Sequence, residues 1–435
     1  MNKREVYLVD GARTPFLRAK GKPNEFPAAD LLLGAARPLM LRQPFAADAF
    51  DEVVMGCVMP GPDESNIARI LALRLGCGEQ MSAFTVQRNC ASGMQALDVA
   101  CRNIADGYQE MVLAGGVEAM SHAPLLFRQP MVEWLADWNR TRTFSARLKQ
   151  LLKLRAGYFA PVIAILKGLS DPVVGLSMGQ TAENLAWRFG IDRRTMDAYA
   201  LQSHQRLNAA VENGHLEEIV PLYGVSGRVH DHDDGLRADS TLEKLAKLKP
   251  AFDRPYGLVT AGNSAQITDG ATCLILASKK AVEKHDLPVM ARLHPAWWAG
   301  VDPAQMGLGP VHAIAKLLQN QSLTLSDMDY WEINEAFAAQ VLACRKALAD
   351  PDYCREYLGT EKPFGKIPLQ RLNVDGGGIS LGHPVGSSGA RIVLHLAHVL
   401  RREKKRRGIA SLCIGGGQGG AMLVENLSEQ NHESL

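Results

Sequence analysis

The sequence predicts an α/β fold with a duplicated organisation, and three observations support this prediction. Short apolar runs of strand length alternate with helical patterns through most of the chain, which is typical of buried strands covered by helices. The alternation occurs once before about residue 122 and again after about residue 250. Hydrophobic residues make up 46% and charged residues 22% of the 435 residues, as expected for a globular protein with a sizeable core.

The first half of the chain contains the elements of one layered unit. Its apolar runs predict strands at 5–9, 51–55, 81–86 and 111–114. Helical spacing of apolar residues predicts helices at 30–40, 66–75 and 93–104. The second half repeats this rhythm, with strands expected at 273–277, 329–333 and 411–414 and helices at 311–318, 336–348 and 388–402.

The region between the two halves breaks the rhythm with prolines and a polar, acidic stretch at 230–234. We therefore expect an inserted loop domain at 122–250. The N-terminal half is then formed by 1–121 and 251–277, and the C-terminal half by 278–435.

Charge and cysteine content exclude several classes of protein. The chain has 48 Lys and Arg against 46 Asp and Glu, and the net charge of +2 gives no electrostatic reason to expect nucleic acid. Its eight cysteines form no C-x-x-C pair, so we expect neither a zinc ribbon, a disulfide framework nor another metal site. No apolar run approaches the roughly 18–20 residues that span a membrane. No signal-peptide pattern follows the charged start, so we expect a cytoplasmic protein.

Two basic segments each admit two interpretations. Between about 130 and 170, basic residues alternate with leucines. This pattern fits an amphipathic helix that contacts a membrane or an acidic partner, and equally a packed helix pair with a solvated face. The run 401–407 has the composition of a nucleic-acid patch. It fits better as the end of a helix, where cations are favourable and Gly408 supplies the stop.

Cys90 is the first candidate for chemistry, because it lies directly after a predicted strand and before a predicted helix. At such a junction, the positive end of the helix dipole is expected to lower the thiol pKa from its usual value of about 8.5. The alternative is a small buried residue in a tight turn.

His383 is the second candidate and lies in the glycine-rich segment 373–386. Glycines at this density imply close backbone approach or positive φ, so His383 lies on a constrained turn rather than on an apolar helical face. A histidine in this setting is a candidate general base, although a lone histidine is often structural.

Cys413 precedes a literal G-x-G-x-x-G pattern at Gly415, Gly417 and Gly420. This pattern binds dinucleotides only where a helix follows, whereas residues 421–424 predict a strand. We therefore expect a tight turn between two strands, with a cysteine and backbone N–H groups suited to an oxyanion.

Asn334 and Glu335 follow the predicted strand at 329–333. They fit the start of a helix, with an N-cap and a first-turn charge. They equally fit a polar pair that orients a water molecule or a histidine.

These segments together resemble the thiolase family of acyl-CoA acetyltransferases and 3-ketoacyl-CoA thiolases. The resemblance extends almost from end to end, and the order and spacing of the motifs are specific although each alone is weak. Further matches are the segments 11–16, 115–121, 178–184, 260–264 and 268–271, together with Arg254. The resemblance implies a duplicated five-layer α/β/α/β/α fold with an inserted loop domain, assembled as a homodimer or tetramer.

The resemblance also implies roles for the candidate residues. Cys90 matches the nucleophile that becomes acylated, and His383 matches the base that activates it. Cys413 matches the second cysteine, which moves a proton to and from the acetyl-CoA enolate. Asn334 matches the residue that fixes an oxyanion-hole water, and the backbone N–H groups of Cys90 and Gly415 match a second oxyanion hole.

The implied reaction is the reversible cleavage of a 3-ketoacyl-CoA by CoA, through an acyl-Cys90 intermediate and ping-pong kinetics. CoA is then a substrate, and no permanently bound cofactor is needed. Ser264 and Met178 match CoA contacts. The sequence departs from the family pattern at Ala265, where many members carry a serine that contacts pantetheine, and at Ser177, where a histidine is frequent.

The basic insert near 125–170 resembles that of thiolase subunits in fatty-acid β-oxidation trifunctional complexes. This implies a degradative enzyme with a hydratase/dehydrogenase partner subunit and peripheral membrane contact through 130–170. The alternatives are a short-chain acetoacetyl-CoA thiolase working in the condensing direction, a ketoacyl synthase, and a catalytically lapsed acyl-CoA-binding subunit. Cys413 argues against the synthase, and only Ala265 supports the lapsed subunit.

Overall fold

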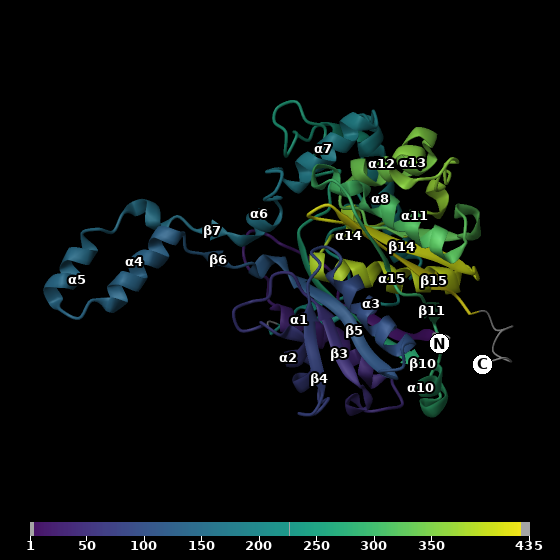
Figure 1. Cartoon of the computed structure of the whole chain (residues 1–435), viewed down its shortest axis with the longest axis horizontal. Helices are drawn as coiled ribbons and strands as arrows, with labels where there is room; N and C mark the ends of the chain where they lie inside the picture. The colour runs from purple at the N-terminus through teal and green to yellow at the C-terminus, as the bar shows by residue number, and fades with distance from the viewer. Residues whose placement is uncertain (1–3, 226, 428–435) are drawn as a thin grey trace.

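The strands of both halves join in one mixed sheet within residues 4–225 and 227–427, which the computed structural model describes (Figure 1). This sheet has 11 strands, and its central path runs β13-β14-β15-β11-β1-β10-β5-β3-β4. The short strand β11 pairs with both β1 and β15, so it links the two halves. The strands are β1 (Val6–Arg13), β2 (Leu17–Arg18), β3 (Glu52–Gly56), β4 (Ser82–Val86), β5 (Met111–Ala119), β10 (Thr268–Ser278), β11 (Ala291–Leu293), β12 (Trp297–Gly300), β13 (Tyr330–Ile333), β14 (Arg407–Ile414) and β15 (Gln418–Glu425).

Helices lie in three layers around these strands. Helices α3 (Ser92–Ala105) and α15 (Val385–Arg402) pack against each other, and α15 contacts β5 on one side and β14 on the other. Helices α1 (Ala28–Leu41) and α2 (Ile67–Leu75) cover the outer face of the N-terminal strands, and α11 (Gly309–Gln321) covers that of the C-terminal strands. The predicted five-layer α/β/α/β/α fold is thereby confirmed.

Glycines allow the two central helices to begin side by side. A Cβ atom on Gly93 would lie 2.8 Å from the main-chain oxygen of Gly386, and one on Gly389 would lie 2.6 Å from the main-chain nitrogen of Met94. Larger residues would therefore force α3 and α15 apart. The close approach places the turn that precedes α3, which carries Cys90, next to the turn that precedes α15.

The remaining helices pack around the C-terminal half or lie at its edges. Helix α12 contacts both α7 and α8 above the C-terminal strands (Figure 1). Their bounds, with those of the smaller helices, are α7 (Met178–Arg188), α8 (Arg193–Glu212), α9 (Leu242–Ala246), α10 (Lys279–His285), α12 (Ala338–Ala349), α13 (Pro351–Leu358) and α14 (Gly378–Leu381).

The basic insert forms an arm that projects from the body (Figure 1). Two short strands, β6 (Leu125–Leu126) and β7 (Val162–Ile163), pair as its neck, followed by α6 (Ala164–Gly168). Beyond the neck lie α4 (Gln129–Arg140) and α5 (Phe144–Leu151), which contact each other. Among the described residues, no helix is long and apolar enough to cross a membrane.

One local expectation was wrong, and one of the two interpretations of Asn334 and Glu335 is excluded. Helix α15 ends at Arg402, and Lys404 with φ +50° takes the left-handed conformation after it, whereas Gly408 lies inside β14. Helix α12 begins at Ala338 with Phe337 as its N-cap residue, so neither Asn334 nor Glu335 caps it. In both segments the main chain pairs with a strand instead of ending or starting a helix. Gly408 pairs with Tyr330 of β13, and the N–H of Asn334 bonds to the carbonyl of Ser411 in β14.

Candidate active site

Cys90 lies in the turn between β4 and α3, two residues before the helix begins. Asn89 has a positive φ of 43°, which bends the chain sharply at this point. The hydroxyl of Ser92 accepts a hydrogen bond from the N–H of Arg88 at 2.9 Å and donates one to the carbonyl of Asn89 at 2.7 Å. These contacts fix the turn, so Cys90 is held in one position at the start of the central helix layer.

The pKa of the Cys90 thiol is raised above its ordinary value, mainly because burial disfavours the thiolate. Hydrogen bonds from the N–H groups of Gly415 and of Cys90 itself act in the opposite direction, and the charge of Glu118 raises the pKa further. The expected lowering of this pKa by the helix is therefore wrong for the free protein. The thiol needs a base to accept its proton.

Cys413 lies in the last part of β14, paired with Gly419 of β15, and the predicted tight turn between the two strands follows at 415–417. Gly416 and Gly417 have φ of +91° and +78°, and antiparallel pairing of β14 with β15 resumes at once. The glycines therefore make a hairpin turn and not a dinucleotide site. Burial, followed by the charge of Cys90, raises the pKa of the Cys413 thiol well above its ordinary value.

His383 lies between α14 and α15, directly after Gly382 with φ +111°. Its ring Nδ1 lies 2.6 Å from the hydroxyl oxygen of Ser388, and its Nε2 lies 3.4 Å from Nδ2 of Asn334. Burial, together with the charge of Arg391, lowers the pKa of His383 to about 4. The imidazole is therefore neutral at physiological pH and able to accept a proton.

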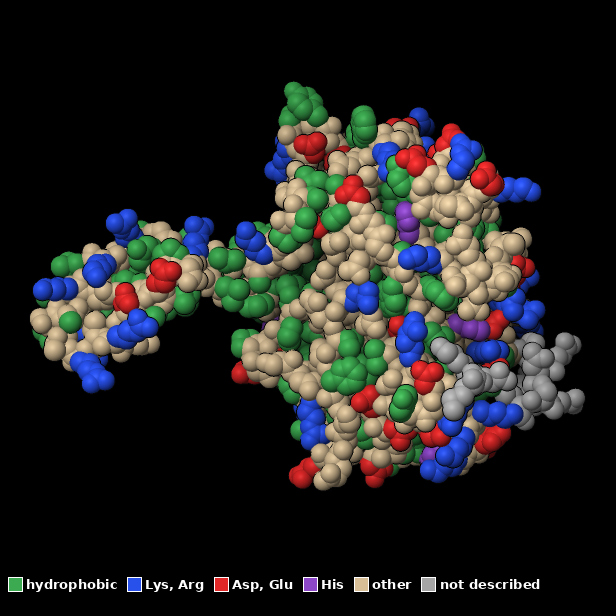
Figure 2. All heavy atoms as spheres, viewed as in Figure 1, with side chains coloured by type: hydrophobic (Ala, Val, Ile, Leu, Met, Phe, Trp, Pro, Cys, Tyr) green, Lys and Arg blue, Asp and Glu red, His purple; other side chains and the backbone are tan. Residues whose placement is uncertain are grey.

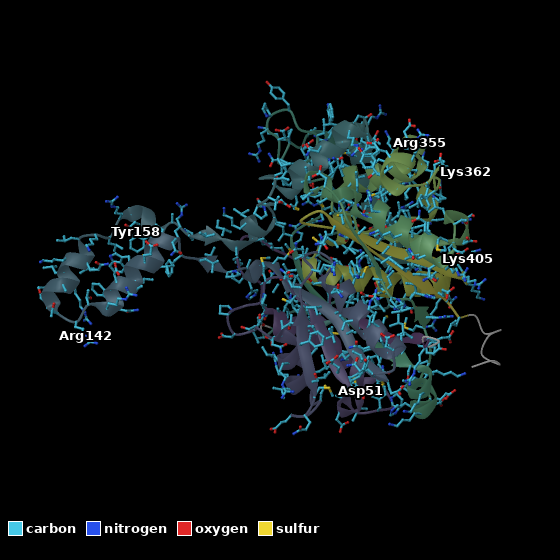
Figure 3. The ribbon with its side chains drawn as sticks, in the orientation of Figure 1. Asp51, Arg142, Tyr158, Arg355, Lys362 and Lys405 are labelled. Atoms are coloured by element: carbon cyan, nitrogen blue, oxygen red, sulfur yellow. The ribbon has the colours of Figure 1, made fainter. Side chains whose placement is uncertain are left out.

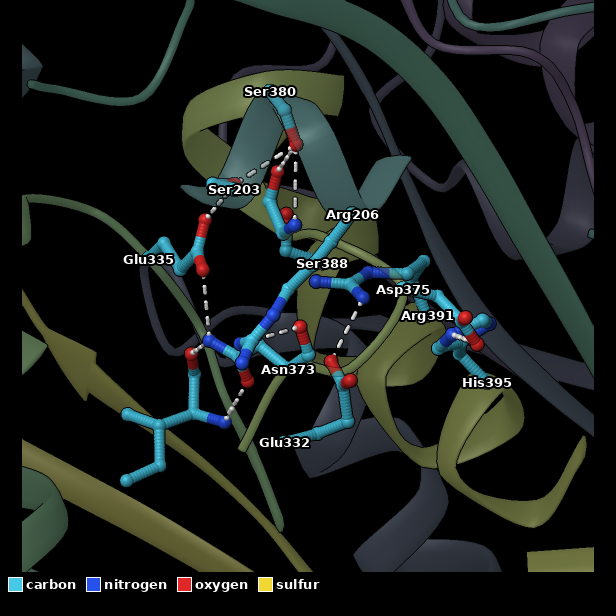
Figure 4. A network of polar contacts seen from close by, with 12 residues as sticks. Ser203, Arg206, Glu332, Glu335, Asn373, Asp375, Ser380, Ser388, Arg391 and His395 are labelled. Carbon is cyan, nitrogen blue, oxygen red and sulfur yellow. Dashed lines mark hydrogen bonds and ion pairs between the residues drawn. The ribbon is translucent and has the colours of Figure 1, made fainter. Parts of the chain in front are cut away.

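Asn334 and Glu335 point in different directions. The N–H of Asn334 donates to the carbonyl of Ser411, which places Asn334 beside β14 near Cys413 and brings its side chain to His383. The carboxylate of Glu335 instead accepts hydrogen bonds from Ser203 and Asn373, which Figure 4 shows, and from the hydroxyl of Tyr199. Of the predicted polar pair, Asn334 alone contacts the histidine, and Glu335 holds the glycine-rich loop in place.

The two proposed CoA contacts differ in their surroundings. Met178 is the first residue of α7, and its sulfur lies 3.3 Å from the position that a Cβ on Gly415 would occupy. The hydroxyl of Ser264 is buried and donates to the carbonyl of Thr260 at 2.7 Å. Met178 therefore lies at the cysteine turns, whereas Ser264 can offer a ligand only the lone pairs of its oxygen.

Glu118 is a residue of this region to which the sequence analysis assigned no role. Its buried carboxylate accepts hydrogen bonds from the N–H groups of Val58, Met59 and Gly386 at 2.9–3.1 Å. Burial raises the pKa of Glu118 to about 7. An acid at the end of the otherwise apolar strand β5 was the available signal.

A cavity of about 160 Å³ lies near His383, and the sequence did not predict it. Its wall includes the cations Arg237 and Lys244 and also Gln266. The main-chain carbonyl oxygen of Gln266 accepts a hydrogen bond from the main-chain N–H of His383 at 3.0 Å.

In the part of the chain that the structure describes, no group of three or more His, Cys, Asp and Glu side chains could hold a metal ion.

Comparison with known proteins identifies the family. Residues 6–280 match the model of the N-terminal thiolase domain, and residues 287–426 match that of the C-terminal thiolase domain. The chain belongs to the thiolase family. It is thus an acyltransferase of the thiolase class.

Several relatives match this thiolase over almost its full length. The mitochondrial trifunctional enzyme subunit beta of Bos taurus is 38% identical over 427 residues, covering 98% of this chain and 89% of the relative. The beta-ketoadipyl-CoA thiolase of Pseudomonas aeruginosa is 40% identical over 433 residues, covering 98% and 100%. A crystal structure of human mitochondrial 3-ketoacyl-CoA thiolase in complex with CoA has 37% identity and a TM-score of 0.84, covering 98% of both chains.

Proposed function

We propose that this thiolase cleaves 3-ketoacyl-CoA with CoA to give acetyl-CoA and a shortened acyl-CoA, in fatty-acid β-oxidation. One observation carries the proposal: the amide of Asn89 bonds to Gly415 at 2.8 Å, so the turn of Cys90 adjoins the turn that follows Cys413, and the N–H groups of Gly415 and Cys90 are donors to the Cys90 sulfur. A nucleophilic thiol, a second thiol and paired N–H donors are the groups that this carbon–carbon bond cleavage requires.

In the first half-reaction, His383 accepts the proton of Cys90, and the thiolate attacks the C3 carbonyl carbon of the substrate. The carbonyl electrons move to the oxygen, which N–H donors stabilise. When the carbonyl re-forms, the bond between C2 and C3 breaks. The carbanion at C2 of acetyl-CoA takes a proton from Cys413, and the acyl group remains on Cys90 as a thioester.

In the second half-reaction, a new CoA thiol gives its proton to the thiolate of Cys413, and the CoA sulfur attacks the acyl-thioester. The N–H groups of Cys90 and Gly415 again stabilise the tetrahedral oxyanion, and a water held by Asn334 stabilises the enolate oxygen of acetyl-CoA. The Cys90 sulfur leaves and takes back its proton from His383, and the shortened acyl-CoA is released. The two successive transfers predict ping-pong kinetics, and no bound cofactor takes part in any step.

CoA reaches the cysteines, in this proposal, from the side of Met178 and the cavity beside His383. Arg237 and Lys244 at the cavity wall suit the phosphates of CoA, because cations pair with phosphate oxygens. Ser264 serves only as an acceptor, since its proton is already donated to Thr260.

The test is CoA-dependent loss of 3-ketoacyl-CoA over chain lengths from C4 to C16, with Cys90→Ala as the control. Activity that rises with chain length, and is absent from Cys90→Ala, supports the proposal. Activity confined to C4 favours the short-chain acetoacetyl-CoA thiolase. Binding of acyl-CoA without turnover at any length favours the lapsed subunit, and full activity of Cys90→Ala contradicts the mechanism.

The arm supports a second proposal, that residues 130–170 make peripheral contact with an anionic membrane surface. Figure 2 shows apolar and cationic side chains together on the projecting arm. On α5, the side chains of Phe144, Leu148 and Leu151 are 85%, 53% and 45% exposed, and their spacing places them on one face. Cations accompany them, among them Arg142 near the far end of the arm (Figure 3). This combination suits the interface of a bilayer.

We also propose that the protein assembles with copies of itself and with a hydratase/dehydrogenase partner. The bovine relative is named as a subunit of a trifunctional enzyme, which supports the partner. Strand β4 is the last strand of the sheet and exposes alternate side chains, which suits pairing with a second copy. Measurement of the particle mass in solution tests both assemblies: the protein alone for self-assembly, and the protein with a candidate partner for the complex. The cytoplasmic location stays a prediction.

A further inference from the structure

Ser388 has two close polar contacts beside the ring of His383. Its hydroxyl oxygen lies 2.6 Å from Nδ1 of His383 and 3.0 Å from the carbonyl oxygen of Pro384. All of these groups are inside the protein, with Ser388 1% and His383 8% exposed. Water is therefore largely excluded as an alternative partner.

One proton arrangement satisfies both contacts of the hydroxyl. The Pro384 carbonyl oxygen can only accept, so in this arrangement the single proton of Ser388 is donated to Pro384. The hydroxyl oxygen then accepts from His383, which requires a proton on Nδ1. A neutral imidazole carries only one proton, so Nε2 has a free lone pair.

The contact on the other side of the ring fits this tautomer. Nε2 of His383 lies 3.4 Å from the side-chain nitrogen of Asn334, which is an N–H donor. A proton on Nε2 would place two donors face to face. The Asn334 and Ser388 contacts therefore favour the same protonation state of the ring.

We propose that Ser388 is the positioning residue that holds His383 as the Nδ1–H tautomer, with Nε2 free to accept the proton of Cys90. This inference rests on the proposed thiolase mechanism. When the proton moves from the Cys90 sulfur to Nε2, the resulting imidazolium keeps its Nδ1–H bond to Ser388, so no other proton has to move. The Nε2–H then becomes a donor.

The position of Ser388 in the helix suits this task. It lies in the first turn of α15, where Gly389 packs directly against α3. A side chain fixed on a packed helix holds its partner more precisely than one on a loop. The neighbouring Ser387 is equally buried, but its hydroxyl lies 2.7 Å from that of Thr272, so it provides a matched control.

The direct test is ¹⁵N NMR of protein labelled in its histidine rings, with the His383 signals assigned by their loss in His383→Asn. Free and protonated ring nitrogens have clearly different shifts. We expect a protonated Nδ1 and a free Nε2 in the native protein, and a mixture of tautomers in Ser388→Ala. Ser387→Ala should give the native pattern. A free Nδ1 in the native protein would overturn the inference.

Kinetics give a second readout. Loss of one buried hydrogen bond that orients the base should lower kcat roughly tenfold in Ser388→Ala and leave KM nearly unchanged. Ser387→Ala should retain kcat. Equal losses of kcat in the two variants would show a merely structural role and overturn the inference. Because NMR needs no turnover, absence of thiolase activity in the native protein would contradict the proposed function separately.

Discussion

The side-chain amide of Asn89 donates a hydrogen bond of 2.8 Å to the main-chain oxygen of Gly415. This bond joins the two turns that carry the cysteines, one from each half of the chain. It holds the carbonyl of Gly415, the residue whose N–H is a hydrogen-bond donor to the Cys90 sulfur. A second bond joins the same segments, since the guanidinium of Arg88 donates to Oε1 of Gln418 at 2.9 Å.

Replacement of Asn89 by glycine is expected to reduce activity without unfolding the protein. Glycine adopts the positive φ of residue 89 freely, so the turn is retained while the bond to Gly415 is lost. The net value of one hydrogen bond, about 1 kcal/mol, corresponds to roughly a fivefold loss of kcat. Steady-state kinetics with thermal unfolding measure both effects.

Ser322→Gly is the control for this substitution. Ser322 also has a positive φ, of 54°, but it lies after α11, far from the cysteines in the chain. This variant should keep the native kcat. An unchanged kcat in Asn89→Gly would contradict the orienting role of the amide.

The pH dependence of Cys90 alkylation follows from the raised pKa of its thiol. Iodoacetamide reacts with the thiolate, and the raised pKa leaves little thiolate at neutral pH. We expect the alkylation rate of the free enzyme to rise continuously from pH 7 to pH 9, as the thiolate fraction grows. Mass spectrometry localises the product, and Cys90→Ala serves as the control. A plateau below pH 8 would show a lowered pKa instead.

The local sequence predicted the turns beside which the candidate residues lie. Cys90 and His383 each lie in a short turn before a helix, and Cys413 lies in the strand before a turn. Glycines and polar residues mark such turns in the sequence itself. The two readings of the G-x-G-x-x-G pattern could be separated because the residues after it have the spacing of a strand. Local pattern was sufficient wherever a single turn determined the position.

Tertiary packing determined what the sequence did not predict. The pKa of Cys90 is raised mainly by burial, which depends on tertiary packing, so the helix dipole alone gave the wrong direction. Glu335 turns away from His383 because Tyr199 and Asn373 offer donors from distant segments. The role of Glu118 required knowledge that Gly386 lies beside it.

His395 is expected to stabilise the fold as a buried cation. Its two ring nitrogens lie 3.0 Å from Glu218 and 3.2 Å from Asp375, and Figure 4 shows the contact with Asp375. Although burial opposes the charge, these carboxylates raise the pKa of His395 to about 10. Removal of one member of a buried ionic network costs about 3–5 kcal/mol, so His395→Leu should lower the free energy of unfolding by this order.

The stabilisation that His395 contributes is expected to decrease as the pH rises. The folded pKa of His395 lies above its unfolded value of about 6.5, so its stabilisation is complete below that pH and is lost as the pH rises towards 10. Denaturant unfolding should show this decline in the native protein and a weaker one in His395→Leu. His398→Leu is the control, since burial lowers the pKa of His398. Parallel declines in all three proteins would contradict the assignment.

Binding of the arm to anionic vesicles should depend on its exposed apolar side chains. Phe144, Leu148 and Leu152 are 85%, 53% and 81% exposed, and burial of such side chains in a bilayer interface contributes about 1.5–3 kcal/mol each at most. Their joint replacement by serine should abolish co-sedimentation with vesicles that contain phosphatidylserine, while thiolysis of soluble substrate is retained.

A matched control separates this effect from general surface hydrophobicity. Leu41 and Trp187 are each 87% exposed on the body, and their replacement by serine should leave vesicle binding unchanged. Because the cations of the arm contribute to binding, added salt should weaken it, and neutral vesicles should bind less. Equal co-sedimentation of the native protein and the arm variant would remove the arm as the contact. The exposed face of α5 would then be available for a protein partner, which pull-down with the candidate hydratase/dehydrogenase subunit would detect.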